Sequence, residues 1–105
     1  MQTTAINIAT TINNVNGIEA EDGQKIYELV NEAISNGQKV ALSFLDMETL
    51  TNEFLDTAIG QLYRDNSNEF IKAHLEITNI SVSGKIVLKR VVNIAKSYFT
   101  NSQTS

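Results

Sequence analysis

The sequence predicts a small α/β protein with a mostly parallel or mixed sheet of three to four strands and three helices. Two observations carry this prediction. Segments with the two-residue period of strands alternate with segments at helical spacing, in the order strand, helix, strand, helix, strand, helix. Residues 39–45 also form a nearly continuous apolar run, which is typical of a buried strand. Such alternation indicates parallel strands joined by right-handed helical crossovers.

The first strand is predicted at residues 5–9, where apolar and polar residues alternate. The stretch 10–17 is rich in Asn and Thr and ends in Asn-Gly, a turn signal. It is compatible with an extension of the first strand or with a hairpin back to Ile18. A helix follows at residues 22–36, because apolar residues recur at helical spacing and a second Asn-Gly pair ends them.

The central strand is predicted at residues 39–45, and a polar loop leads from it into a second helix at residues 52–64. The core face of this helix carries Leu55, Ala58, Ile59 and Leu62.

A loop at residues 65–68 and a third strand at residues 73–78 precede the last helix. Ser81 or Ser83 can cap that helix, which is expected to end at about Thr100. Its expected apolar face comprises Val87, Leu88, Val91, Ile94, Ala95 and Tyr98. The polar residues 101–105 are predicted to form a flexible tail.

Length and composition limit the possible classes of function. We expect one domain over residues 1–105, with a single modest core. The absence of cysteine excludes disulfides, thiolate metal sites and cysteine nucleophiles. No apolar run approaches the about 20 residues that a membrane span needs, and the first residues lack a signal-peptide pattern. The expectation is therefore a soluble cytoplasmic protein.

Charge is distributed unevenly along the chain, whose net charge is −4. All 12 acidic residues lie at or before Glu76, whereas four cations and no acid follow it. The sequence thus predicts an acidic body with a basic last helix. An acidic body argues against nucleic-acid binding, because phosphate contacts need a broad positive surface.

The residue types that catalysis needs do not occur together in this sequence. His74, the single histidine, has no nucleophile paired with it. Asp46 and Glu48 are two carboxylates without the further oxygen ligands of a recognised cation site. There is also no glycine-rich phosphate loop. We therefore expect a non-enzymatic protein without a metal or cofactor.

The loop after the central strand is the candidate binding region. In α/β proteins, ligands and partners are usually met where strands end and the following helices begin. Asp46 and Thr49 lie in this loop, and Thr51 or Asn52 is positioned to cap the second helix. Glu53 would follow in the first turn, where the helix dipole favours negative charge.

Gly60 is a further candidate. A helical wheel places it with Glu53, Thr57 and Arg64, opposite the core face of the second helix. A glycine exposed in mid-helix costs about 1 kcal/mol relative to alanine, so it needs a reason. One reason is that a partner approaches the backbone closely, and the other is tight packing against a loop of the same chain.

Three lysines of the last helix, Lys85, Lys89 and Lys96, fall within a narrow stripe. The simplest interpretation is a solvated cationic face. The functional interpretation is docking to an acidic surface, including the acidic half of another copy, so a homodimer is possible.

Residues 54–63, FLDTAIGQLY, together with the strand at residues 40–45, resemble a STAS-like family of unassigned function found in bacteria and phages. This family is related in fold to anti-sigma-factor antagonists. The resemblance implies a STAS-like fold whose strand, loop and helix bind a GHKL-type ATP-binding kinase or a related regulator. In the antagonists that kinase phosphorylates a serine within an Asp-Ser-Ser-Gly-like motif at the start of the helix.

This sequence departs from that motif, because residues 51–54 read Thr-Asn-Glu-Phe and place Glu53 at or beside the position of the serine. Glu53 carries a permanent single charge, against about 1.5 to 2 charges on a phosphoserine. Thr51 is the possible phosphoacceptor if the register slips, and Thr49 is another.

The sequence therefore predicts a regulatory module that binds another protein through the loop and the outer face of the second helix. The alternative is a small ligand- or nucleotide-sensing or structural subunit, in which Lys39 or Arg64 supplies a cation to the loop. The predicted partner-binding residues are Asp46, Thr49, Thr51, Asn52, Glu53, Thr57, Gly60 and Arg64.

Overall fold

The computed structural model describes residues 2–104, with the side chains of residues 2–99. Its main sheet has three parallel strands in the order β1-β3-β5, and β2 and β4 form a short separate parallel pair. The prediction of an α/β fold with a parallel sheet is thus confirmed. The elements are β1 (Thr3–Asn7), α1 (Ile8–Ile12), β2 (Asn16–Gly17), α2 (Ala20–Ser35), β3 (Lys39–Ser43), β4 (Thr49–Leu50), α3 (Asn52–Leu55), the π-helical turn η1 (Asp56–Gly60), α4 (Gln61–Asp65), α5 (Asn68–His74), β5 (Leu75–Thr78) and α6 (Val82–Thr104).

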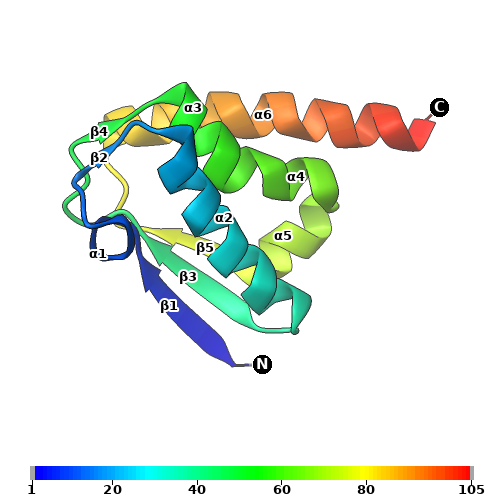
Figure 1. The fold of residues 1–105 in the computed structure, drawn as a ribbon. Helices are drawn as coiled ribbons and strands as arrows, with labels where there is room; N and C mark the ends of the chain where they lie inside the picture. The colour runs from blue at the N-terminus through cyan, green and yellow to red at the C-terminus, as the bar shows by residue number, and fades with distance from the viewer. Residues whose placement is uncertain (1, 105) are drawn as a thin grey trace.

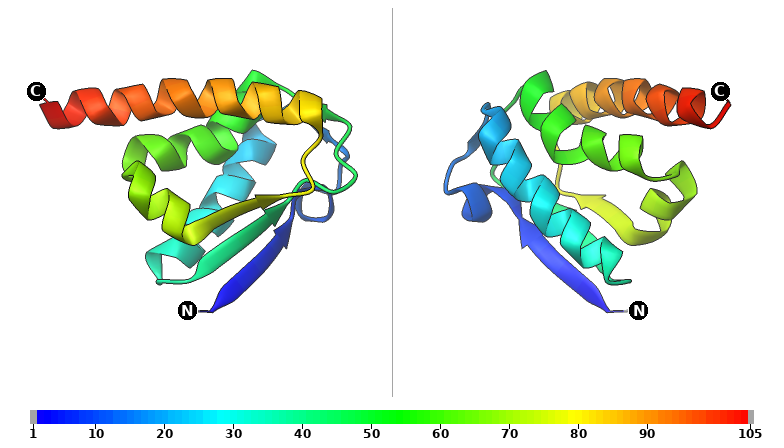
Figure 2. Two further views of the ribbon diagram at one scale, coloured as in Figure 1. Left: turned by 180° about the vertical axis from the view of Figure 1, so that it is seen from behind. Right: turned by 45° about the vertical axis from the view of Figure 1, so that its right-hand side comes forward.

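The elements stack in layers (Figures 1 and 2). One face of the sheet is covered by α2 and by the continuous helical segment α3–η1–α4, which lie side by side. The last helix, α6, lies across α3, η1 and α4 on the side away from the sheet. The segment α3–η1–α4 is therefore enclosed by α2 on one flank and by α6 on another.

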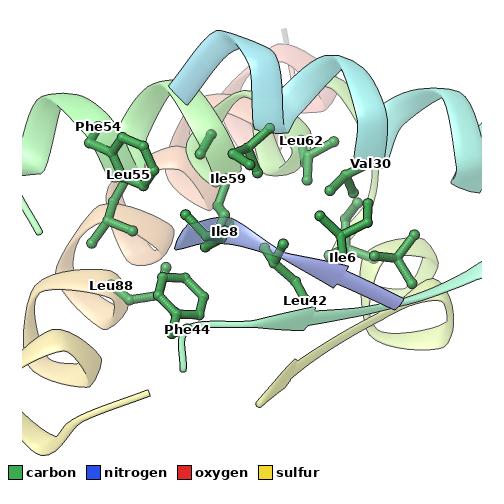
Figure 3. Packing of buried hydrophobic residues seen from close by; sticks show 14 of the residues in the cluster. Ile6, Ile8, Val30, Leu42, Phe44, Phe54, Leu55, Ile59, Leu62 and Leu88 are labelled. Carbon is green, nitrogen blue, oxygen red and sulfur yellow. The ribbon is translucent and has the colours of Figure 1, made fainter. Parts of the chain in front are cut away.

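The core fills the space between the sheet and its covering helices. Ile6 and Leu42 occupy matching register positions on β1 and β3, and both point toward the helices. Figure 3 shows Val30 and Leu62 above them, so the apolar stripes of α2 and α4 close this layer. Burial alternates along β3, with Val40 and Leu42 buried and the intervening Ala41 half-buried. This strand therefore buries one face more deeply than the other.

The predictions for the first 17 residues were wrong in detail. The first strand ends at Asn7, and Ile8 begins the short helix α1 instead of continuing the strand. The reason is a local cap, because the Asn7 side chain accepts a hydrogen bond of 2.9 Å from the Thr10 amide. Asn16 and Gly17 then pair in parallel with β4, so neither the strand extension nor the hairpin forms.

The predicted loop and third strand also needed correction. A short helix, α5, occupies residues 68–74, and its start is capped by Ser67, whose hydroxyl accepts from the Phe70 amide at 3.1 Å. His74 is consequently the last residue of this helix and not a strand residue. Its ring stacks on that of Phe70, with the two centroids 4.2 Å apart.

The last helix begins as predicted and extends beyond its predicted end. Ser81 is the capping residue, because its hydroxyl accepts from the Gly84 amide at 3.0 Å. The helix continues to Thr104, four residues past the expected end at Thr100. The side chains of the predicted flexible tail, residues 101–105, lie outside the described residues, so that part stays a prediction.

Candidate functional site

The carboxyl ends of β1, β3 and β5 meet at one edge of the sheet, at the end of the molecule where β2 and β4 lie (Figure 1). Asn13, Asp46 and Asn79 have positive φ values of 54°, 68° and 57°, and each follows a different strand of the sheet. Asn and Asp tolerate this left-handed conformation better than most residues. Each strand of the main sheet is therefore followed at this edge by a sharply turned connection.

The loop between β3 and α3 is fixed by backbone hydrogen bonds. The Glu48 amide donates to the Val15 carbonyl at 2.7 Å, and the Thr51 amide donates to the Gly17 carbonyl at 3.0 Å. Between them, Thr49 and Leu50 pair with β2. Two loops that follow different strands are thus joined to each other by backbone hydrogen bonds.

Thr51, one of the two predicted capping residues, is the N-cap of α3. Its hydroxyl accepts from the Phe54 amide at 3.1 Å and donates to the Ile18 carbonyl at 3.0 Å. Both hydrogen-bonding functions of the hydroxyl are therefore in use. A phosphoryl group on Thr51 would replace the donating proton and break the bond to Ile18. The assignment of Thr51 as a phosphoacceptor stays a prediction.

Apolar and acidic side chains are exposed together at this edge. Leu45 and Ile18 are 50 % and 43 % exposed, although leucine and isoleucine are usually buried. Asp46 and Glu48 are exposed in the loop between β3 and α3, and Glu53 is exposed in the first turn of α3. We call this surface the carboxyl-edge face, and it comprises Ile18, Leu45, Asp46, Glu48, Thr49, Asn52 and Glu53.

Gly60 does not lie on the surface, so the prediction of an exposed glycine was wrong. It is buried, and a Cβ atom at this position would lie 2.5 Å from Asp56 Oδ1 and 3.3 Å from Val91 Cγ1 of α6. The space without a side chain lets Asp56 Oδ1 reach across Gly60 to Arg64 Nη1, at 2.6 Å. Gly60 is thus explained by an ion pair and by close packing of a helix within the same chain.

Thr57 and Arg64 do not share one outer face of the second helix. Thr57 packs toward α2, where a Cβ atom added to Gly23 would lie 3.0 Å from the Thr57 Cβ atom. Arg64 instead faces the side of α6, together with Asp56. The predicted partner-binding residues are therefore divided between two flanks of the helix, and the loop residues form a third group.

A groove of about 530 Å³ runs between α6 and the segment α3–η1–α4. It brings together Asn52, Glu53 and Arg64 from the predicted set. Ile94 and Tyr98 belong to the predicted apolar face of the last helix, and both are more than half exposed on the wall of this groove. The groove is lined by Asn52, Glu53, Asp56, Arg64, Arg90, Val91, Ile94 and Tyr98.

The sequence interpretation missed Arg90 as a groove residue. Arg90, Ile94 and Tyr98 follow one another at four-residue intervals, which places them along one ridge of α6. That spacing was the available signal, but it does not show which other helix the ridge faces.

The other flank of α6 packs against α4. Lys96 Nζ lies 5.6 Å from the centroid of the Tyr63 ring, within the range of a cation–π contact. Burial raises the pKa of the Tyr63 hydroxyl above its ordinary value, so this group stays neutral at physiological pH. Lys96 is half-buried here, whereas Lys85 and Lys89 are exposed. The predicted lysine stripe therefore divides into one packed lysine and two exposed ones.

A family model described as a STAS-like domain of unknown function (DUF4325) matches residues 22–85. The chain belongs to this family. The match includes the candidate loop and the whole segment α3–η1–α4 of this STAS-like domain, but it stops at Lys85, near the start of α6. Arg90, Ile94 and Tyr98 thus lie beyond the matched part. Neither the curated proteins nor the solved structures compared with the chain gave a match.

Two further findings concern the described part of this STAS-like domain. None of its helices is long and apolar enough to cross a bilayer. Among the residues described, no three His, Asp or Glu side chains gather in an arrangement that could hold a metal ion.

Proposed function

We propose that this STAS-like domain is a non-enzymatic regulatory module that binds another protein through the carboxyl-edge face. The observation that carries the proposal is the exposure of Leu45 and Ile18 among acidic residues, on loops held by hydrogen bonds. Exposed apolar side chains rimmed by charge are typical of protein interaction sites. A preformed loop also loses little conformational entropy on binding, which favours affinity.

The chemistry of this face suggests the chemistry of its partner. Asp46, Glu48 and Glu53 give the face negative charge in addition to its two exposed apolar side chains, Ile18 and Leu45. The complementary surface is apolar with a basic rim, and opposite charges of this kind raise the association rate. A GHKL-type ATP-binding protein is the partner that the family resemblance suggests. Binding would then regulate such a protein by competition or sequestration.

Glu53 offers a reason for a binding mode without a phosphorylation switch. It is exposed in the first turn of α3, near the place where the antagonists carry their phosphorylated serine. A glutamate carries its single negative charge without any phosphorylation. The proposed module therefore stays in one charge state, and its activity is set by abundance and competition.

The first experiment compares capture of proteins from the source cell by the native chain and by a Leu45→Ser/Glu53→Lys variant. The captured protein is identified and its affinity then measured with both purified forms. We expect binding to weaken about tenfold or more, because the variant loses an apolar contact and reverses a charge in the rim.

The matched control is Glu69→Lys, which makes the same charge change in the first turn of α5. It should leave affinity unchanged. Equal affinity of the native chain and the double variant for the captured protein would refute the carboxyl-edge face as the binding surface.

A second candidate function, sensing of a small anionic ligand, is favoured by the groove beside α6. Its volume lies within the range of small-molecule sites, and two cations line it, Arg64 and Arg90. Two acids, Glu53 and Asp56, line it as well, and Asp56 is paired with Arg64. Arg64 uses one of its five donor hydrogens in its ion pair with Asp56, which leaves further donors for an anion.

A thermal-shift screen with nucleotides and small organic anions tests this candidate. A ligand in this groove should raise the unfolding midpoint of the native chain and not that of Arg90→Ala. Lys72→Ala, which removes a cation from α5, is the control and should respond as the native chain does. A shift that survives in Arg90→Ala would place the ligand elsewhere.

A further inference from the structure

The outer face of α6 combines two cations with two exposed apolar side chains. Val82, Lys85, Ile86 and Lys89 follow the i, i+3, i+4, i+7 spacing that places residues on one side of a helix. Val82 and Ile86 are 80 % and 57 % exposed, the former being the highest value among the exposed large hydrophobic residues of the described chain. We call these four residues the α6 outer face.

The two lysines of the α6 outer face have no ion-pair partner within the described side chains. The sequence after Glu76 contains no Asp or Glu, so α6 itself offers no carboxylate. Within residues 2–99, whose side chains are described, neither Lys85 nor Lys89 forms an ion pair. The acids that would complement these lysines are concentrated on the body, including those of the carboxyl-edge face.

The two faces lie at the same end of the molecule. The start of α6 packs on β4, since a Cβ atom added to Gly84 would lie 2.9 Å from the Leu50 side chain. Glu48 and Thr49 line a hollow together with Ser81 and Ser83. Figure 1 shows the start of α6 next to β2 and β4. Val82, Lys85, Ile86 and Lys89 lie on the side of α6 opposite Gly84, so the α6 outer face points away from β4 and is free for a second copy.

We propose that a second copy of this chain docks here, with its α6 outer face against the carboxyl-edge face of the first. Lys85 and Lys89 meet Glu48 and Glu53, and the exposed apolar side chains of both faces meet in the centre. The two sets match in charge and in apolar character, and every copy carries both.

This inference goes beyond the proposed function, because it concerns the purified chain alone. It also has a consequence for that function. The second copy covers the carboxyl-edge face, so self-association and binding of another protein exclude one another.

The test is sedimentation velocity of the purified full chain over a range of concentrations, with two charge-reversal variants. One is Lys85→Glu/Lys89→Glu and the other is Glu48→Lys/Glu53→Lys. Each variant alone should stay monomeric, with self-association weakened on the order of tenfold or more by like charges. An equimolar mixture should associate again, because the reversed α6 outer face of one complements the reversed carboxyl-edge face of the other.

Lys72→Glu is the control, since it reverses a charge on α5 and should dimerise as the native chain does. Native association should also weaken as added salt shortens the Debye length from about 10 Å at 0.1 M to about 3 Å at 1 M. The proposal would be overturned if the native chain stayed monomeric. It would also be overturned if neither charge reversal weakened association, or if the equimolar mixture failed to associate. Failure to capture another protein from the source cell would count against the proposed function and not against self-association.

Discussion

Replacement of Gly23 by alanine is expected to destabilise the fold by about 2–3 kcal/mol. The added Cβ atom would lie 2.6 Å from the Phe54 carbonyl oxygen and 3.2 Å from the Ala58 amide nitrogen. Both atoms belong to the backbone of the neighbouring helical segment, so no side-chain rotation can relieve the clash. The two helices must separate, and that opens the layer of core residues between them and the sheet.

Equilibrium unfolding in urea measures this effect, with Gly60→Ala as the matched control. At Gly60 the nearest atom to an added Cβ is the carboxylate end of Asp56, which can rotate away at the cost of its half-exposed ion pair with Arg64. That pair is worth at most about 1 kcal/mol, and alanine gains about as much in helix propensity. Gly60→Ala should therefore leave stability within about 1 kcal/mol of the native value. Equal stability of the two variants would contradict the close backbone contact at Gly23.

The prediction for Gly23 shows what periodicity could and could not establish in this chain. The sequence indicated α2, the segment α3–η1–α4 and α6, because each has a long apolar stripe at helical spacing. Periodicity gives no helix-to-helix distance, so it did not identify Gly23 as the point of closest approach. The short helices α1 and α5 were not predicted, for a different reason. They are started by the single caps Asn7 and Ser67, and each is too short to show a repeating pattern.

The candidate site was predictable to the extent that it depends on local chemistry. Thr51 was identified as a possible cap because a threonine precedes a run with helical spacing, and the structure confirms that role. The burial of Gly60 was not predictable, because a helical wheel represents one helix with one packed face. A second flank of this helix is covered by α6, whose contacting residue Val91 is 31 positions farther along the chain. The groove beside α6 was missed for the same reason.

Truncation of Phe54 to alanine is expected to cost about 3–5 kcal/mol, the range for a fully buried phenylalanine. Its side chain is completely buried and lies next to Leu55 among the core residues, at the level of the helices (Figure 3). The ring also lies 2.9 Å from the position that a Cβ atom on Gly17 would occupy, so it packs directly against β2. Urea unfolding measures the loss. The matched control is Phe70→Ala on α5, where the ring is half-buried and the cost should be clearly smaller.

The same substitution should loosen the carboxyl-edge face before the fold is lost. Phe54 supports β2 from the core side, and β2 in turn accepts a hydrogen bond from the Thr51 amide through the Gly17 carbonyl. Hydrogen exchange at the Thr51 amide should therefore accelerate more in Phe54→Ala than the loss of global stability requires. In Phe70→Ala, the exchange rate of the Thr51 amide should change only as much as the loss of global stability predicts.

Because the proposed binding face depends on a fixed loop, a loosened loop in Phe54→Ala would weaken binding while every exposed contact residue stays unchanged. Exchange at Thr51 that follows global stability alone would show that Phe54 does not fix the loop.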